Sequence, residues 1–251
     1  MRYKDYIELA EKNEVKSFIY DDPIQFCYNY SDKKNIEIAG IISSWLSYGM
    51  RKVFIPKINN LLINIMNNKP YEYIMNGDWN KYKDDYTCLY RMTTWHNFAM
   101  LCEKLRSVYL NSKDLEEATL NHFIDRNTRF KFYYQSLCDL LSGETMIPSS
   151  TSLSANKRMN MFLRWMIRKD SEVDLGLWKN FKQSNLLVPC DAHVLNTALE
   201  LGLIKKVDET QRVVVKITDY AKKVFDTDPA RMDFALYGYG INKLKNESIK
   251  E

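Results

Sequence analysis

Apolar residues recur along most of this chain at intervals of three and four positions, the spacing that gathers them on one face of an α-helix. One such run ends before Gly49 and carries Ile38, Ile41, Ile42 and Trp45. Another ends before Pro70 and carries Ile58, Leu61, Leu62 and Ile65. Alternation of apolar and polar residues, which is typical of strands, is scarce. The pattern therefore predicts an all-α protein of roughly ten helices.

Capping residues and further periodic runs complete the predicted helices. Asp22 before Pro23 is a typical N-cap followed by proline at the first helical position. Beyond the two runs above, the expected helices cover residues 2–12, 23–28, 92–109, 113–125, 129–142, 157–166, 192–201 and 211–226, with a last one from Pro229. Residues 71–90 are expected to form a loop with a short helical piece. Val213–Val215 would also suit a short strand, but the polar flanks favour a helix.

A polar break at Pro148–Ser152 follows Gly143 and is the most distinct interruption of the helical pattern. It is too short to be a free linker. With 251 residues, the chain is long enough to bury a sizeable core. We therefore expect residues 1–251 to form a single all-α domain of two helical lobes with a cleft between them, and a lobe boundary near residues 143–154.

Composition narrows the class of protein. A hydrophobic content of 45% with 8 Gly and 6 Pro argues against a disordered or fibrous chain. No apolar run approaches the roughly 20 residues that span a bilayer, so no membrane partner is expected. The start, MRYKDYIELAEKNEV, lacks the apolar core of a secretory signal, which favours the cytoplasm. The net charge of +4 is compatible with a polyanionic partner but also with many other proteins.

Metal and cofactor chemistry finds little support in the sequence. The five cysteines are Cys27, Cys88, Cys102, Cys138 and Cys190, and their spacings fit neither a disulfide framework nor paired metal ligands. Reduced and mostly buried thiols are expected. The three histidines form no HxxxH or HExxH pair, and there is no glycine-rich nucleotide loop and no GxSxG. The sequence therefore predicts no metal and no cofactor.

Two residues in the stretch 154–204 carry the sharpest candidate chemistry. Lys157 lies at an expected helix start, where it is either a solvated lysine or, if its pKa is lowered by burial and by Arg158, an amine nucleophile. Asp191 follows Pro189 at the start of the next helix, where it is either an N-cap alone or also a carboxylate that stabilises a developing cation. These roles can coexist.

The residues around Asp191 resemble a known segment. Residues 187–194, reading LVPCDAHV, and 199–203, reading LELGL, are similar to the proline-aspartate segment of the helix-hairpin-helix DNA glycosylase superfamily. Lys157 is placed like the Schiff-base lysine of its bifunctional members, in particular the archaeal 8-oxoguanine glycosylases. Over nearly its whole length the chain also resembles a bacterial family of conserved hypothetical proteins, the domain of unknown function 2400, in the segments 22–24, 37–40, 48–52, 157–166 and 233–238.

The superfamily resemblance implies a bifunctional DNA N-glycosylase and AP lyase that excises an oxidised purine from double-stranded DNA. Lys157 would attack the sugar C1′ and Asp191 would stabilise the positive charge on the sugar. The residues implied in contact with the flipped base or with phosphate are Tyr48, Arg51, Arg158, His193, Phe234 and Tyr237, and Arg164 is a further phosphate candidate. The alternative is core packing for the three aromatic residues and a surface salt bridge for Arg51.

The chain departs from that superfamily in two places. Residues 147–154 lack the glycines of the usual Leu-Pro-Gly-Val-Gly hairpin, and no cysteine follows Cys190 to hold an iron–sulfur cluster. Two other hypotheses therefore stay open: a non-catalytic nucleic-acid-binding helical protein, and a structural or interaction protein. A monomer is favoured.

Overall fold

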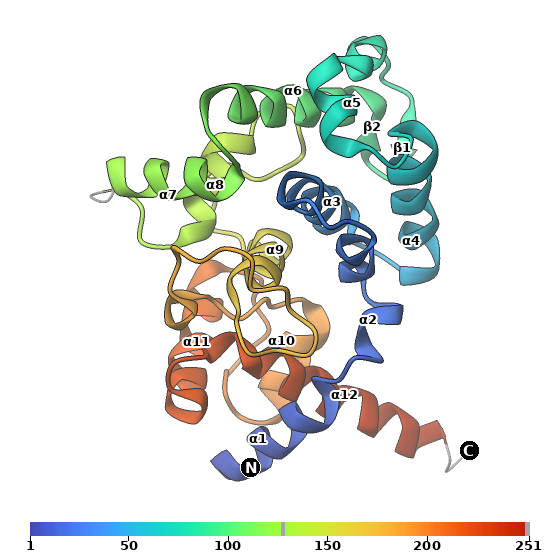
Figure 1. Cartoon of the computed structure of the whole chain (residues 1–251). Helices are drawn as coiled ribbons and strands as arrows, with labels where there is room; N and C mark the ends of the chain where they lie inside the picture. The colour runs from blue at the N-terminus through green and yellow to red at the C-terminus, as the bar shows by residue number, and fades with distance from the viewer. Residues whose placement is uncertain (127–128, 249–251) are drawn as a thin grey trace. The chain divides into compact units, whose positions relative to one another are not determined.

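The computed structural model describes residues 1–126 and 129–248, and helices make up most of them (Figure 1). The strands among these residues are β1 (Cys88–Tyr90) and β2 (Thr93–Thr94), which pair antiparallel. The prediction of an all-α protein is confirmed. No helix of the described chain is both long and apolar enough to cross a bilayer.

The chain divides into two compact units. Unit 2 runs from Asp21 to Ser152, and unit 1 joins Met1–Tyr20 to the chain from Leu153 onward. The second division falls at the end of the polar break, at Ser152 and Leu153. The first division lies inside the short helix α2 (Phe18–Asp21), so the N-terminal helix belongs with the C-terminal part of the chain.

Unit 2 is built around α3 (Lys33–Leu46), which is buried from Ile36 to its end. The 3-10 helix η1 (Pro23–Asn29) and α5 (Pro70–Asn76) pack on α3. The remaining elements of unit 2 are α4 (Arg51–Asn59), η2 (Asn60–Ile65), η3 (Asp78–Tyr82), the two strands, α6 (Trp95–Asn111), α7 (Leu115–Asp125) and α8 (Tyr133–Leu141). Asp22 caps η1 as expected, since its carboxylate accepts from the Ile24 amide at 3.1 Å.

In one helical run of unit 2, the buried residues differ from those that the sequence predicts. The run from Ile58 to Ile65 was expected to bury one straight stripe, but η2 is a π-helix, with the Met66 amide donating to the Leu61 carbonyl. The wider turn shifts the side-chain register by one residue. Met66 is therefore buried where Ile65 was expected, and Ile65 is half-buried.

The segment 71–90, expected to be a loop with one helical piece, is more ordered than that. It contains α5, η3 and β1, and Arg91 between the strands has a φ of +51°. The hairpin was missed because its strands are too short to show an alternating pattern.

Unit 1 contains α1 (Tyr3–Asn13), α9 (Lys157–Ile167), η4 (Gln183–Asn185), α10 (Ala192–Glu200), α11 (Gln211–Phe225), η5 (Pro229–Arg231) and α12 (Met232–Ser248). The terminal helices α1 and α12 lie side by side (Figure 1). Gly238 permits this close packing, because a Cβ there would overlap the Asn13 side chain. Helix α9 is buried on all sides from Met159 to Ile167, and so is at the centre of the unit.

A long connection leads from α9 to α10 without regular helix or strand over most of its length. It is nevertheless packed: Trp178 is fully buried, its amide donates to the Met166 carbonyl, and its ring meets Phe162 edge-on at 5.4 Å. The connection therefore fixes the start of α10 relative to α9.

Candidate active site

The structure brings Lys157 and Asp191 together. The Lys157 Nζ lies 3.8 Å from Asp191 Oδ2, although the two residues are 34 positions apart in the sequence. Both side chains reach solvent, with 28% of Lys157 and 41% of Asp191 exposed. The separation is longer than a direct hydrogen bond, so the two groups are close neighbours without being locked together.

Lys157 is the first residue of α9, and the backbone before it holds it in place. Asn156 has a left-handed φ of +47°, a conformation that asparagine tolerates better than most residues. Just before it, Ser154 forms an antiparallel bridge with Thr210, and the Ala155 amide donates to the Glu209 carbonyl at 2.9 Å. The start of α9 is therefore tied to the segment that leads into α11.

Asp191 is the N-cap of α10, and its two carboxylate oxygens have different neighbours. Oδ1 accepts from the Val194 amide at 3.0 Å, whereas Oδ2 is the atom nearest Lys157. The backbone before it is also anchored, because the Val188 amide donates to the buried hydroxyl of Thr218 on α11. The cap predicted from the sequence is confirmed, and it leaves one oxygen directed at the lysine.

This arrangement can perform nucleophilic chemistry on a carbon that develops positive charge. A lysine amine is a nucleophile in its neutral form, and a neighbouring carboxylate stabilises a cation formed beside it. The adjacent Cys190 does not compete as a nucleophile. It is buried, and this burial together with the carboxylates of Asp233 and Asp191 raises the pKa of the Cys190 thiol.

The other candidate residues of unit 1 are divided between core and surface. His193, two residues into α10, is exposed, and Arg158 is half-buried beside Lys157. Phe234 is 1% exposed, with the Arg164 guanidinium 4.5 Å from its ring centroid. Tyr237 is half-buried and meets the ring of Phe18 edge-on, as Phe234 also does.

Tyr48 and Arg51 belong to unit 2. The Tyr48 hydroxyl donates to the Tyr90 carbonyl at 2.8 Å, which joins the end of α3 to β1. Arg51 is 40% exposed and its guanidinium lies 3.8 Å from the Asp22 carboxylate. In their own unit, both residues therefore make contacts that also stabilise the fold.

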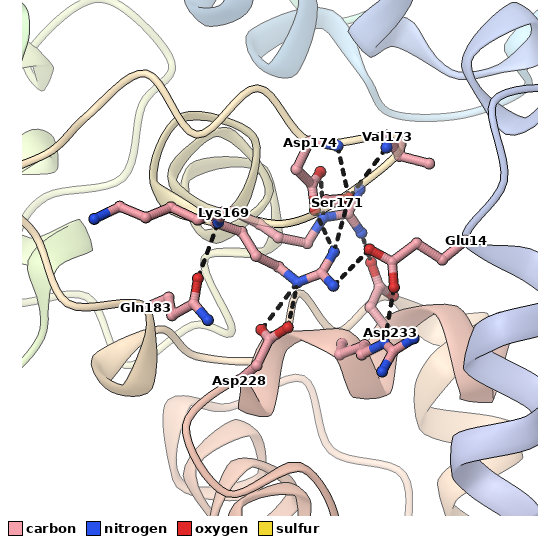
Figure 2. Close-up of polar contacts among 11 residues, drawn as sticks. Glu14, Lys169, Ser171, Val173, Asp174, Gln183, Asp228 and Asp233 are labelled. Atoms are coloured by element: carbon pink, nitrogen blue, oxygen red, sulfur yellow. Dashed lines mark hydrogen bonds and ion pairs between the residues drawn. The ribbon is translucent and has the colours of Figure 1, made fainter.

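Sequence reasoning missed a buried cluster of charge at the other end of α9 (Figure 2). We call it the arginine network, and its members are Glu14, Arg164, Arg168, Asp174, Asp228, Arg231 and Asp233. Arg168 is at its centre, with ion pairs of 2.5 Å to Glu14, 2.7 Å to Asp174 and 2.8 Å to Asp228. Although burial opposes its charge, these carboxylates raise the pKa of Arg168.

The network overturns the phosphate role considered for Arg164. Its side chain is 2% exposed and pairs with Asp174 and Asp233, so it lies inside unit 1 and not on a polar helix face. The sequence held one signal of this: Arg164 has apolar neighbours, with Phe162 and Leu163 before it and Trp165 and Met166 after it. That signal was ambiguous because arginine is mostly exposed in proteins.

The cysteines and histidines are spread over both units of the described chain. None of the five cysteines is in a disulfide; Cys27, Cys102, Cys138 and Cys190 are buried as expected, but Cys88 is exposed. Cys88 lies on the missed hairpin. No group of histidine, cysteine and carboxylate side chains in the described chain is arranged to hold a metal ion.

These features define a helical protein with an exposed lysine–carboxylate pair on a rigid base. The chain belongs to the family described as "Protein of unknown function (DUF2400)", whose model matches residues 22–242. No curated protein and no solved structure matches the chain.

Proposed function

We propose that this protein is a bifunctional DNA glycosylase and lyase that removes an oxidised purine through a Schiff base on Lys157. The observation that carries the proposal is the approach of Lys157 Nζ to Asp191 Oδ2, 3.8 Å apart at the starts of two helices. The resemblance of residues 187–203 to the superfamily's proline-aspartate segment supplies the class of reaction.

The reaction begins with a nucleotide flipped out of the duplex, at a cost that is least for a mismatched or damaged base. The neutral amine of Lys157 forms a bond to C1′ while the C1′–N9 bond breaks, and the purine leaves with the electron pair and is protonated. Asp191 stabilises the positive charge that develops on the sugar. Its fixed orientation as an N-cap means that little reorganisation is needed.

One amine proton then passes to the ring oxygen O4′ and the C1′–O4′ bond breaks, which opens the sugar ring and leaves a protonated imine between Lys157 and C1′. Removal of a C2′ proton breaks the bond from C3′ to its phosphate oxygen, which cleaves the strand by β-elimination. Hydrolysis of the imine by water releases the enzyme. No metal or redox partner enters this sequence of steps.

The test is borohydride trapping on duplexes that contain 8-oxoguanine, uracil or an abasic site. Native protein is expected to form a covalent adduct with the abasic duplex and with at least one damaged base. Lys157→Ala is expected to form none. The matched control is Lys169→Ala, an exposed lysine two residues beyond α9, which should trap like the native protein.

Asp191→Asn separates the two steps. Asparagine retains the cap, so the adduct with a pre-formed abasic site should persist while base excision is strongly reduced. An adduct that survives Lys157→Ala, or the absence of any adduct with native protein, would overturn the proposal. Salt-dependent binding without trapping would instead support a non-catalytic nucleic-acid-binding protein.

A further inference from the structure

A group of exposed cations lies on the segment that is bridged to the start of α9. Lys205 and Lys206 lie on the connection between α10 and α11, before the bridge residue Thr210, and Arg212 follows Thr210 as the second residue of α11. All three are exposed. We call Lys205, Lys206 and Arg212 the basic strip. Neither the lysine–carboxylate pair nor the fold described above requires these three side chains.

The direction of the bridge places the basic strip relative to Lys157. Ser154 pairs antiparallel with Thr210, and the Gln211 amide donates to the Leu153 carbonyl at 2.8 Å. In an antiparallel pair, one chain runs forward as the other runs back. Lys206 and Lys205 therefore extend from the bridge toward the side of Lys157, and Arg212 extends toward the side of Leu153.

The connection that carries the lysines is anchored at both ends. Helix α10 ends in a left-handed Gly202, with φ of +73°, and the Leu203 amide donates to the Ala198 carbonyl at 2.8 Å. Ile204 is 4% exposed and holds the connection to the core. Lys205 and Lys206 follow this anchor at once, so their backbone is fixed while their side chains project into solvent.

The charges and the apolar surface of this region suit a nucleic-acid backbone. The Lys206 ammonium is 4.0 Å from Asp208, the outer limit of an ion pair, and its side chain is 82% exposed. Leu153, which accepts a hydrogen bond from the amide of Gln211, the residue before Arg212, is 73% exposed. Cations beside an exposed apolar residue can contact phosphate and sugar together, and phosphate contacts dominate binding to duplex DNA.

We propose that the basic strip binds the phosphate backbone of duplex DNA next to the Lys157–Asp191 pair. This proposal rests on the proposed function for the identity of the partner, but it concerns binding and needs no chemistry at Lys157.

The experiment measures fluorescence anisotropy with a labelled duplex that contains a tetrahydrofuran abasic analogue, which cannot form an imine. Affinity is recorded over a series of KCl concentrations for the full chain. In the variant Lys205→Gln/Lys206→Gln/Arg212→Gln, the slope of log affinity against log salt should fall in magnitude by roughly 2 to 3, because each lost phosphate contact removes about 0.9.

The matched control is Lys222→Gln/Lys223→Gln, two exposed lysines in the last turn of α11. Arg212 and Lys222 are ten positions apart, which is about 15 Å along a helix. This control should keep the native slope. Thermal unfolding, followed by circular dichroism, is used to check that each variant is folded.

The proposal is overturned if the triple variant keeps the native slope, if the control loses as much, or if native protein shows no salt-dependent binding. The two proposals fail separately. If the triple variant has a smaller slope but native protein forms no Lys157 adduct, DNA binding by the basic strip is supported and the glycosylase proposal is refuted. If native protein forms the adduct but the triple variant keeps the native slope, the glycosylase proposal is supported and DNA binding by the basic strip is refuted.

Discussion

The two ends of α9 carry charge in opposite ways. At its start, Lys157 and Asp191 are 3.8 Å apart and partly exposed to water. At its end, Arg164 and Arg168 are 2% and 1% exposed and are paired with four carboxylates: Glu14 just after α1, Asp174 in the connection after α9, Asp228 before η5 and Asp233 in α12. Helix α9 thus has a charge pair that is open to solvent at its start and a group of charges that are buried at its end.

The contrast indicates which charges stabilise the fold and which are available for chemistry. Burying an ion costs several kcal/mol, and close partners must compensate that cost, so a buried network tolerates little movement. An exposed pair contributes about 0–1 kcal/mol and can give up its contact to a substrate. The arginine network is therefore the rigid base from which α9 presents Lys157.

The largest expected effect follows from removing the centre of the network. Arg168→Met leaves the carboxylates of Glu14, Asp174 and Asp228 without their shared partner, and breaking a buried pair costs about 3–5 kcal/mol. The free energy of unfolding, measured by urea denaturation, should fall by that amount. Lys169→Met, at the next position and exposed, should change it by less than about 0.5 kcal/mol. Equal effects of the two substitutions would show that the network does not stabilise unit 1.

Asp228 is expected to make a smaller, pH-dependent contribution to the free energy of unfolding. Burial raises the pKa of the Asp228 carboxyl, Arg168 opposes the rise, and Glu14 and Asp174 add to it. A carboxyl with a raised pKa binds its proton more tightly in the folded state than in the unfolded state. Its contribution to stability is therefore greatest at low pH and falls as the pH rises from roughly 3.9 through the raised value.

The check is Asp228→Asn, which removes the titrating group but keeps a polar side chain. The free energy of unfolding of this variant minus that of the native protein should increase between pH 4 and pH 7. A difference that decreases over this range would mean that the pKa of Asp228 is lowered by Arg168 instead.

At the start of α10, the two roles of Asp191 can be separated by comparing two substitutions. Asp191→Ala removes the cap and should lower the free energy of unfolding by about 1 kcal/mol, whereas Asp191→Asn should leave it nearly unchanged. Both should reduce base excision. If alanine costs no more stability than asparagine does, the Val194 contact does not stabilise α10.

The smallest effect on stability is expected at Lys157 itself. Because the pair with Asp191 is partly exposed and longer than a hydrogen bond, Lys157→Ala should change the free energy of unfolding by less than about 0.5 kcal/mol. The melting temperature should likewise change little. A large loss of stability would place Lys157 with the arginines as a structural charge and weaken its candidacy as a nucleophile.

Much of the fold was predictable because its helices follow local signals. The Asp22 and Asp191 caps and the helical Val213–Val215 were each predictable from neighbouring residues. The π-helix at Asn60–Ile65 was not, because its hydrogen-bond register leaves no distinct pattern in the sequence. The hairpin at Cys88–Thr94 was too short to show one.

The charged residues of unit 1 also include some that could be predicted from local signals and others that could not. Lys157 and Asp191 could be singled out because each lies at a recognisable helix start. The arginine network could not, because it joins Glu14 to Arg231, which is 217 positions away, and no local rule links such residues. The basic strip was missed for a related reason, since its segment is joined to the start of α9 by backbone contacts between residues more than 50 positions apart, such as the bridge between Ser154 and Thr210.

The most direct test of the account locates the covalent bond. Native protein is trapped with borohydride on an abasic duplex, digested with protease and analysed by fragment mass spectrometry. The reduced sugar adduct is expected on Lys157, and Lys169, twelve positions further along the chain, is expected to be unmodified. An adduct on any other residue, or no adduct at all, would contradict it.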